Sequence, residues 1–120
     1  MHVELIRTFR FDAAHSLCAV PEGHKCGSLH GHGYQVDVHI EGEVDPATGW
    51  LMDYGELKAV VAPLIDSLDH KNLNDIEGLE NSTSELLAAY LWDRIAPHVP
   101  LLSALTIWES PNSRCVYRGH

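Results

Sequence analysis

Three histidines at the ends of two predicted strands are the residues best suited to chemistry. His15 ends an N-terminal stretch in which apolar and polar residues alternate, and His30 and His32 begin a second such stretch. Residues two apart on a strand point to one face, so the His-Gly-His motif offers two imidazoles to a single point. If the strands pair as an antiparallel hairpin, His15 faces that pair. Three imidazole nitrogens meeting at one point suit zinc, so we predict a Zn²⁺ site with these three ligands.

Other interpretations of these histidines remain open. His30 and His32 could be loop histidines and His15 a core histidine bonded to the backbone, because short motifs often match by chance. The third histidine, arriving at the same end and face from another strand, favours a metal. Zinc usually takes four ligands, so one position remains. Water or substrate there makes the site catalytic, whereas a protein ligand makes it structural.

A loop over residues 16–29 joins the two strands and carries Cys26, four residues before His30. Loops of this length in compact domains tend to be functional. Cys26 is either the fourth zinc ligand or a thiolate that serves as base or nucleophile. The adjacent His24 and Lys25 form a small cationic patch, which is either solvated surface or a phosphate contact.

Two carboxylates stand at positions where acid–base or binding chemistry is expected. Asp69 directly precedes His70, and a histidine oriented by a carboxylate is a common proton-transfer device, although neighbours in sequence need not touch. Glu109 continues the parity of Leu105 and Ile107, so it stands on an otherwise apolar face. A ring with two adjacent N–H donors, such as a guanine or a pterin, would satisfy that carboxylate. The alternative is an exposed glutamate at a strand end.

The elements that must position these groups follow from hydrophobic periodicity. A period of two predicts strands over residues 3–15 and 30–41, and later over 101–107 and 116–117. Capping-box pairs, Asp53 with Glu56 and Ser82 with Glu85, predict the starts of two helices, the first kinked at Pro63. The order β-β-α-α-β-β predicts an α+β fold with a four-stranded antiparallel sheet and two helices on one face. We expect residues 1–120 to form a single domain.

The amino-acid composition argues against some classes of binding partner. A formal net charge of −9 over 120 residues argues against nucleic acid and anionic membranes as general partners. The odd number of cysteines, three, favours reduced thiols and a cytoplasmic location. A four-stranded sheet has two open edges, and open edges tend to pair with another copy, so we expect a ring-like homo-oligomer.

Five ordered segments together resemble the 6-pyruvoyltetrahydropterin synthase / 6-carboxytetrahydropterin synthase family over essentially the whole chain. The segment from Cys26 to His32 is similar to the family's C-x-x-x-H-G-H motif. The others are Phe11-Asp-Ala-Ala-His15, Leu68-Asp69-His70, Asn81-Ser-Thr83-Ser84-Glu85 and Trp108-Glu109. The fourth segment departs from the family's Asn-Pro-Thr-x-Glu at Ser82, which replaces proline at a predicted helix start.

The resemblance implies a tunnelling fold (T-fold), in which trimers close a twelve-stranded barrel, two trimers stack as a hexamer, and active sites lie between subunits. It implies that zinc binds the side-chain hydroxyls of 7,8-dihydroneopterin triphosphate and that Glu109 anchors the pterin. Thr83 and Ser84 join the substrate-binding candidates, as does Lys25. Proton transfer is assigned by the same resemblance to the residues Cys26, Asp69 and His70.

The resemblance also implies the product. Pro21-Glu-Gly-His-Lys-Cys26, Val99-Pro-Leu-Leu-Ser-Ala104 and Cys115-Val-Tyr-Arg-Gly119 are more similar to bacterial 6-carboxytetrahydropterin synthases. We therefore expect loss of triphosphate and acetaldehyde to give 6-carboxy-5,6,7,8-tetrahydropterin, the queuosine precursor. The alternatives are a 6-pyruvoyltetrahydropterin synthase, a non-catalytic zinc module closed by Cys26, and a metal-free enzyme of aldolase or reductase type.

Overall fold

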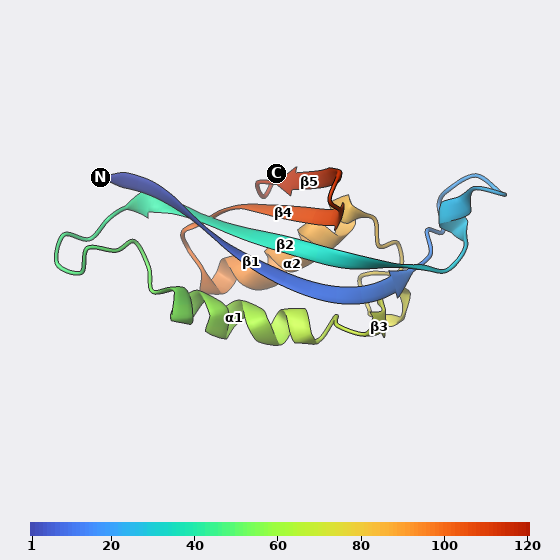
Figure 1. The fold of residues 1–120 in the computed structure, drawn as a ribbon, viewed down its shortest axis with the longest axis horizontal. Helices are drawn as coiled ribbons and strands as arrows, with labels where there is room; N and C mark the ends of the chain where they lie inside the picture. The colour runs from blue at the N-terminus through green and yellow to red at the C-terminus, as the bar shows by residue number, and fades with distance from the viewer.

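Two long antiparallel strands form the centre of the fold and carry the predicted zinc ligands. The computed structural model describes residues 1–120, and in it β1 (His2–His15) pairs with β2 (His30–Glu43). The register is unbroken from His2 opposite Glu43 to His15 opposite His30. Figure 1 shows this hairpin running the length of the molecule, with the connecting loop projecting at the end where His15 and His30 meet. The predicted hairpin is therefore confirmed.

The C-terminal half of the chain completes the sheet. β4 (Leu102–Ser110) lies antiparallel to β2, and a turn leads into β5 (Ser113–Tyr117). A further strand, β3 (Lys71–Asn72), pairs in parallel with the end of β1, so the order is β3-β1-β2-β4-β5. The four predicted antiparallel strands are confirmed. β3 was not predicted, because two residues are too few to show a period.

Both helices pack on one face of the sheet, as predicted (Figure 1). α1 (Tyr54–Asp66) begins after Asp53, whose carboxylate accepts a hydrogen bond from the Gly55 amide at 2.9 Å. The helix continues through Pro63, so the predicted kink does not divide it. α2 (Ser84–Ile95) is capped by Thr83, which accepts from the Leu86 amide at 3.2 Å. The prediction of Ser82 as this cap was wrong by one residue.

The core lies between the sheet and the helices. From the sheet it takes Tyr34, Val36, Val38, Ile40, Leu105 and Ile107, and from the helices Leu57, Val61, Ile65, Leu87, Leu91 and Ile95, all buried. Each such side chain contributes about 1.5 to 3 kcal/mol on burial, so this layer sets the register of the hairpin. The histidines share the parity of these residues and therefore lie on the helix side of the sheet.

The opposite face of the sheet carries a polar network centred on Asp37. Its carboxylate accepts hydrogen bonds from Thr8 at 2.8 Å, from Gln35 at 3.1 Å and from the Trp108 indole at 2.9 Å. Arg114 stacks over the same indole at 4.7 Å from its centre. These contacts tie β1, β2, β4 and β5 together next to Glu109.

Both edges of the sheet leave backbone groups unpaired. β3 covers β1 only at Ala13 and Ala14, and β5 has no neighbour on its outer side. Neither helix has the length and apolar composition needed to span a bilayer.

Candidate functional site

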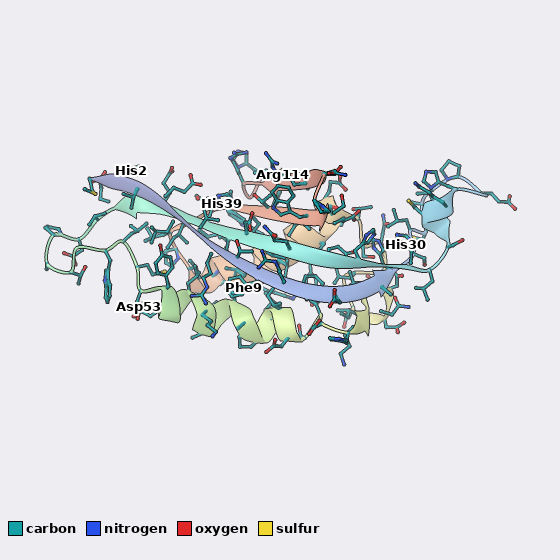
Figure 2. All side chains as sticks on the ribbon, in the orientation of Figure 1. His2, Phe9, His30, His39, Asp53 and Arg114 are labelled. Carbon is teal, nitrogen blue, oxygen red and sulfur yellow. The ribbon has the colours of Figure 1, made fainter.

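The three predicted zinc ligands converge at the loop end of the hairpin. His15 lies directly opposite His30 in the register, and His32 follows two residues later on the same face. The ring centres are 4.6 Å apart for His15 and His30, 5.1 Å for His15 and His32, and 4.9 Å for His30 and His32. One nitrogen from each ring falls within 4.8 Å of the others. Figure 2 labels His30 at this end of β2, beside the projecting loop.

Hydrogen bonds to backbone carbonyls leave a lone pair for a metal on Nε2 of His15 and of His30. Nδ1 of His15 lies 2.9 Å from the Ser82 carbonyl, and Nδ1 of His30 lies 2.7 Å from the Ser28 carbonyl. A carbonyl only accepts, so both Nδ1 atoms are donors and both Nε2 atoms carry a lone pair. Nε2 of His32 is buried without any hydrogen-bond partner. Buried polar atoms normally have a partner, and a zinc ion fits this donor set.

The electrostatics of His15 favour the form that binds metals. Burial lowers the pKa of His15 below its ordinary value of 6.5, although the hydrogen bond to Ser82 and the charge of Glu109 oppose this effect. Neighbouring charge on His30 and His32 would lower it further. The ring is therefore neutral at physiological pH, and a neutral imidazole is a zinc ligand.

Tyr34 and Glu109 form the wall of the histidine cluster. The buried Tyr34 hydroxyl lies 3.3 and 3.4 Å from the two ring nitrogens of His15. Burial and the Glu109 charge both raise the pKa of Tyr34, so it stays protonated. Oε2 of Glu109 lies 3.9 Å from Nε2 of His32. Tyr34 was not among the predicted site residues; its parity with His32, two residues earlier, was the available signal.

Glu109 also lines a small hollow on the helix side of the sheet. The other lining residues are Ser84, Glu85, Ser113, Arg114 and Cys115. Of the two predicted substrate contacts on this side, Ser84 lines the same hollow as Glu109, whereas the Thr83 hydroxyl caps α2. Burial, and secondarily the charge of Glu85, raises the pKa of the Cys115 thiol. Cys115 is thus held as a neutral thiol in this hollow.

Asp69 and His70 do contact each other, but apart from the zinc ligands. Oδ1 of Asp69 lies 3.1 Å from Nδ1 of His70 and accepts a hydrogen bond from the Asp12 amide at 2.9 Å. The Asp12 amide is the main cause that lowers the pKa of Asp69, and the bond from His70 adds to it. Asp12, Asp69 and His70 form a cluster that does not include the three zinc ligands. The two groups are separate clusters in one protomer, although His70 and His32 line one open hollow.

His70 is also the one non-glycine residue with a positive φ, 59°. Its amide donates to the Asp12 carbonyl at 2.7 Å, which fixes the turn against β1. Residues held in this region are strained and often lie at functional sites.

Cys26 and Lys25 lie in the projecting loop, in the 3₁₀ helix η1 (Lys25–Gly27). The carbonyl of Cys26 accepts from the Leu17 amide at 2.8 Å, which closes the loop. The Cys26 thiol is partly exposed and does not belong to the group of three histidine nitrogens. Lys25 and His24 line a separate hollow within the loop.

Ser82 is the neighbour of the metal site that sequence reasoning missed. It is fully buried, and both its carbonyl and its hydroxyl lie within 3.0 Å of Nδ1 of His15. The one available signal was that serine stands where the resembled family has proline, at the predicted start of a helix.

Comparison with known proteins agrees with this arrangement. The profile of the family described as 6-pyruvoyl tetrahydropterin synthase matches residues 4–120. The human 6-pyruvoyl tetrahydrobiopterin synthase is 38% identical over 108 residues, which cover 85% of this chain and 70% of that protein. The Drosophila melanogaster protein of the same name is 40% identical, with 79% of this chain and 62% of that protein covered.

A relative of another name matches over more of its own length. The 6-carboxy-5,6,7,8-tetrahydropterin synthase of Synechocystis is 37% identical over 119 residues, which cover 94% of this chain and 91% of that protein. Among solved structures, the 6-pyruvoyl tetrahydropterin synthase of Caenorhabditis elegans superimposes with a TM-score of 0.92 at 32% identity, covering 100% of this chain and 97% of that one. The chain therefore belongs to the 6-pyruvoyl tetrahydropterin synthase family.

Proposed function

We propose that the chain is a zinc-dependent lyase, 6-carboxy-5,6,7,8-tetrahydropterin synthase, acting in queuosine biosynthesis. It would convert 7,8-dihydroneopterin triphosphate and one water to 6-carboxytetrahydropterin, acetaldehyde and triphosphate. The observation that carries the proposal is the buried, unpartnered Nε2 of His32, which lies among two other imidazoles and beside the Glu109 carboxylate. A metal site bordered by a carboxylate suits a heteroaromatic substrate whose side chain reaches the metal.

Different residues of the chain would bind the metal and the pterin. When bound by His15, His30 and His32, zinc would acidify a side-chain hydroxyl of the substrate. Glu109 would hold the pterin by accepting two N–H hydrogen bonds, with Ser84 in the same hollow. Lys25 and Thr83 would also contact the substrate.

Proton transfer falls to Cys26 and the Asp69–His70 pair. The Asp69 carboxylate accepts a hydrogen bond from the Nδ1–H group of His70. Nε2 of that ring can therefore take up and release a proton. Cys26 would act as a thiolate base from the projecting loop.

The active site would be shared between subunits of a trimer or hexamer. Asp69 and His70 stand apart from the zinc ligands in one protomer, and both edges of the sheet are open to another copy. Pairing of edges would bring the Asp69–His70 pair of one subunit toward the metal of another. The partners would be small pterin triphosphates, with no role for nucleic acid or membrane, and the three free thiols suit the cytoplasm.

Other family members define the competing functions. The human relative at 38% identity carries the name of a 6-pyruvoyl enzyme, which corresponds to elimination of triphosphate alone. The dihydroneopterin monophosphate aldolase of Pyrococcus furiosus is 37% identical over 112 residues and covers 91% of each chain. Coverage of the Synechocystis enzyme exceeds that of the human relative but equals that of the aldolase, so the local segments similar to bacterial 6-carboxytetrahydropterin synthases are what favours the 6-carboxy product.

Product analysis tests the proposal. The zinc-loaded protein is incubated with 7,8-dihydroneopterin triphosphate, the pterins are identified by mass spectrometry, and acetaldehyde is trapped. We expect 6-carboxytetrahydropterin and acetaldehyde in equal amounts, and neither with His30→Ala. Formation of 6-pyruvoyltetrahydropterin without acetaldehyde would overturn the product assignment. Cleavage of dihydroneopterin monophosphate alone would favour the aldolase.

A further inference from the structure

Asn74 connects three segments that surround the zinc ligand His15. It lies in the 3₁₀ helix η2 (Leu73–Asp75), between β3 and α2. Its side-chain oxygen accepts from the Ser16 amide at 2.8 Å, immediately after His15 in β1. Its side-chain nitrogen donates to the Glu80 carbonyl at 3.1 Å and to the Ser82 hydroxyl at 3.2 Å. One amide group thus holds both the strand end that carries His15 and the residue that His15 contacts.

Ser82 presents two oxygens to the same nitrogen of His15. The carbonyl lies 2.9 Å and the hydroxyl 3.0 Å from Nδ1. A hydroxyl could donate to this nitrogen as well as accept from it, whereas a carbonyl only accepts. The carbonyl therefore decides that Nδ1 carries the proton, and Nε2 keeps its lone pair, with the Tyr34 hydroxyl 3.4 Å away. His15 and Ser82 are both buried, so no water competes for these positions.

We infer that Asn74 is a positioning residue of the metal site. By fixing Ser16 and Ser82 together, it keeps the His15 ring in the Nδ1–H tautomer, which leaves the lone pair of Nε2 for the metal. The inference rests on the zinc site proposed above. Groups that bond the outer nitrogen of a metal-bound histidine set its tautomer and orientation, and losing one typically weakens metal binding about 10- to 100-fold.

A purely structural role for Asn74 makes different predictions. If Asn74 only connects loops, removing its side chain lowers the stability of the fold. The His15 tautomer and the zinc affinity of the folded protein then stay unchanged. Asn72 provides the matched control, because its side chain also bonds the backbone of η2, accepting from the Asn74 amide at 3.1 Å, but has no bond to Ser16 or Ser82. Asn72→Ala therefore loosens the same turn and leaves the contacts to Ser82 in place.

The experiment measures zinc affinity and the His15 tautomer on folded variants. Zn²⁺ is titrated into metal-free protein against a competing chelator, and ring nitrogen shifts in the metal-free protein are read by ¹⁵N NMR. For Asn74→Ala we expect about tenfold weaker zinc binding and a His15 signal that is no longer purely Nδ1–H. Asn72→Ala should match the wild type in both. Equal losses in the two variants, or an unchanged tautomer in Asn74→Ala, would overturn the inference.

Ser82→Ala gives a second route should Asn74→Ala fail to fold. The carbonyl remains in this variant, so we expect a smaller loss, about threefold in zinc affinity. In the double variant the losses should combine to less than their product, because Asn74 acts partly through the Ser82 hydroxyl. If the two losses of zinc affinity multiply fully, or if Ser82→Ala loses no affinity, Asn74 does not act through the Ser82 hydroxyl. Wild-type protein that binds zinc but forms no pterin product would refute the proposed function alone, whereas wild-type protein without zinc affinity would refute both.

Discussion

Oε2 of Glu109 lies 3.9 Å from Nε2 of His32, although the two residues come from different strands 77 positions apart in the chain. A register shift in the β4–β5 pairing between Trp108 and Ser110 accompanies this position of Glu109. The same carboxylate raises the pKa of Tyr34 and opposes the lowering of the pKa of His15. The proposed metal ligand His32 and the proposed substrate anchor Glu109 therefore belong to one electrostatic unit.

The substitution Glu109→Gln separates metal binding from pterin binding. The amide keeps the shape but loses the charge, so zinc should remain bound while affinity for a pterin ligand falls about 10- to 100-fold, the worth of a charge-assisted hydrogen-bond pair. Metal content and pterin titration measure the two effects. Glu56→Gln, in the first turn of α1, is the control and should change neither. Unchanged pterin affinity in Glu109→Gln would show that the carboxylate does not anchor the ring.

Removing one imidazole should abolish the metal site. We expect about one zinc per chain in the wild type and none in His30→Ala, since three protein ligands are the minimum for a catalytic zinc site. His98→Ala, in the 3₁₀ helix η3 (Ala96–His98), should retain full metal content. Metal analysis after dialysis provides the measurement. Equal zinc in His30→Ala and wild type would place the metal elsewhere.

Parity along the strands was sufficient to predict the β1–β2 hairpin and the histidine cluster. The alternation of apolar residues before His15 and after His32 fixes which face is buried, and a slip of one residue would expose the core. The hairpin therefore has one register, in which His15 meets His30. Glu109 followed from the same rule applied to β4.

Contacts between distant segments could not be predicted in this way. The bond from His15 to Ser82 joins residues 67 positions apart, and the capping-box pattern assigned Ser82 to the helix instead of neighbouring Thr83. Both residues have hydroxyls suited to a cap, and only the packing of α2 against the sheet decides between them. The contact between Asp69 and His70, and the separation of that pair from the metal, likewise depend on the path of the chain after α1.

Cys26→Ala tests whether the loop thiol acts in catalysis or binds the metal. Because the thiol lies outside the histidine group, zinc should stay bound while turnover falls about 10²- to 10⁴-fold, the usual cost of losing a general base. Zinc content and product formation are measured together. Cys18→Ala, an exposed thiol in the same loop, should leave both intact. Loss of zinc from Cys26→Ala would identify the thiol as a ligand.

The lowered pKa of Asp69 predicts how its contribution to stability depends on pH. The folded pKa lies below the ordinary value of 3.8, so ionised Asp69 stabilises the fold above that value, and the contribution is lost as the pH falls through the folded pKa. Wild type should therefore lose more stability than Asp69→Asn between about pH 5 and pH 2.5. Denaturant unfolding at several pH values gives the two slopes. Parallel slopes would mean that the Asp12 amide and His70 do not stabilise the carboxylate.

The left-handed backbone at His70 predicts an unusual ranking of two substitutions. At φ 59° a side chain costs about 1 to 2 kcal/mol, which glycine avoids, while the extra freedom of glycine in the unfolded chain costs about 0.4 to 1 kcal/mol. His70→Gly should therefore be more stable than His70→Ala by about 0.5 to 1 kcal/mol. Both variants lose the ring and should lose turnover.

His98 supplies the matched comparison, because it lies in a 3₁₀ helix without a positive φ. There the order should reverse, with His98→Ala more stable than His98→Gly, and turnover should persist in both. Chemical denaturation ranks the four proteins. If alanine equals glycine at position 70, the turn is not held in the left-handed conformation. If the predicted order holds, the chain keeps a strained backbone at the turn beside β1 where the His70 imidazole contacts the Asp69 carboxylate.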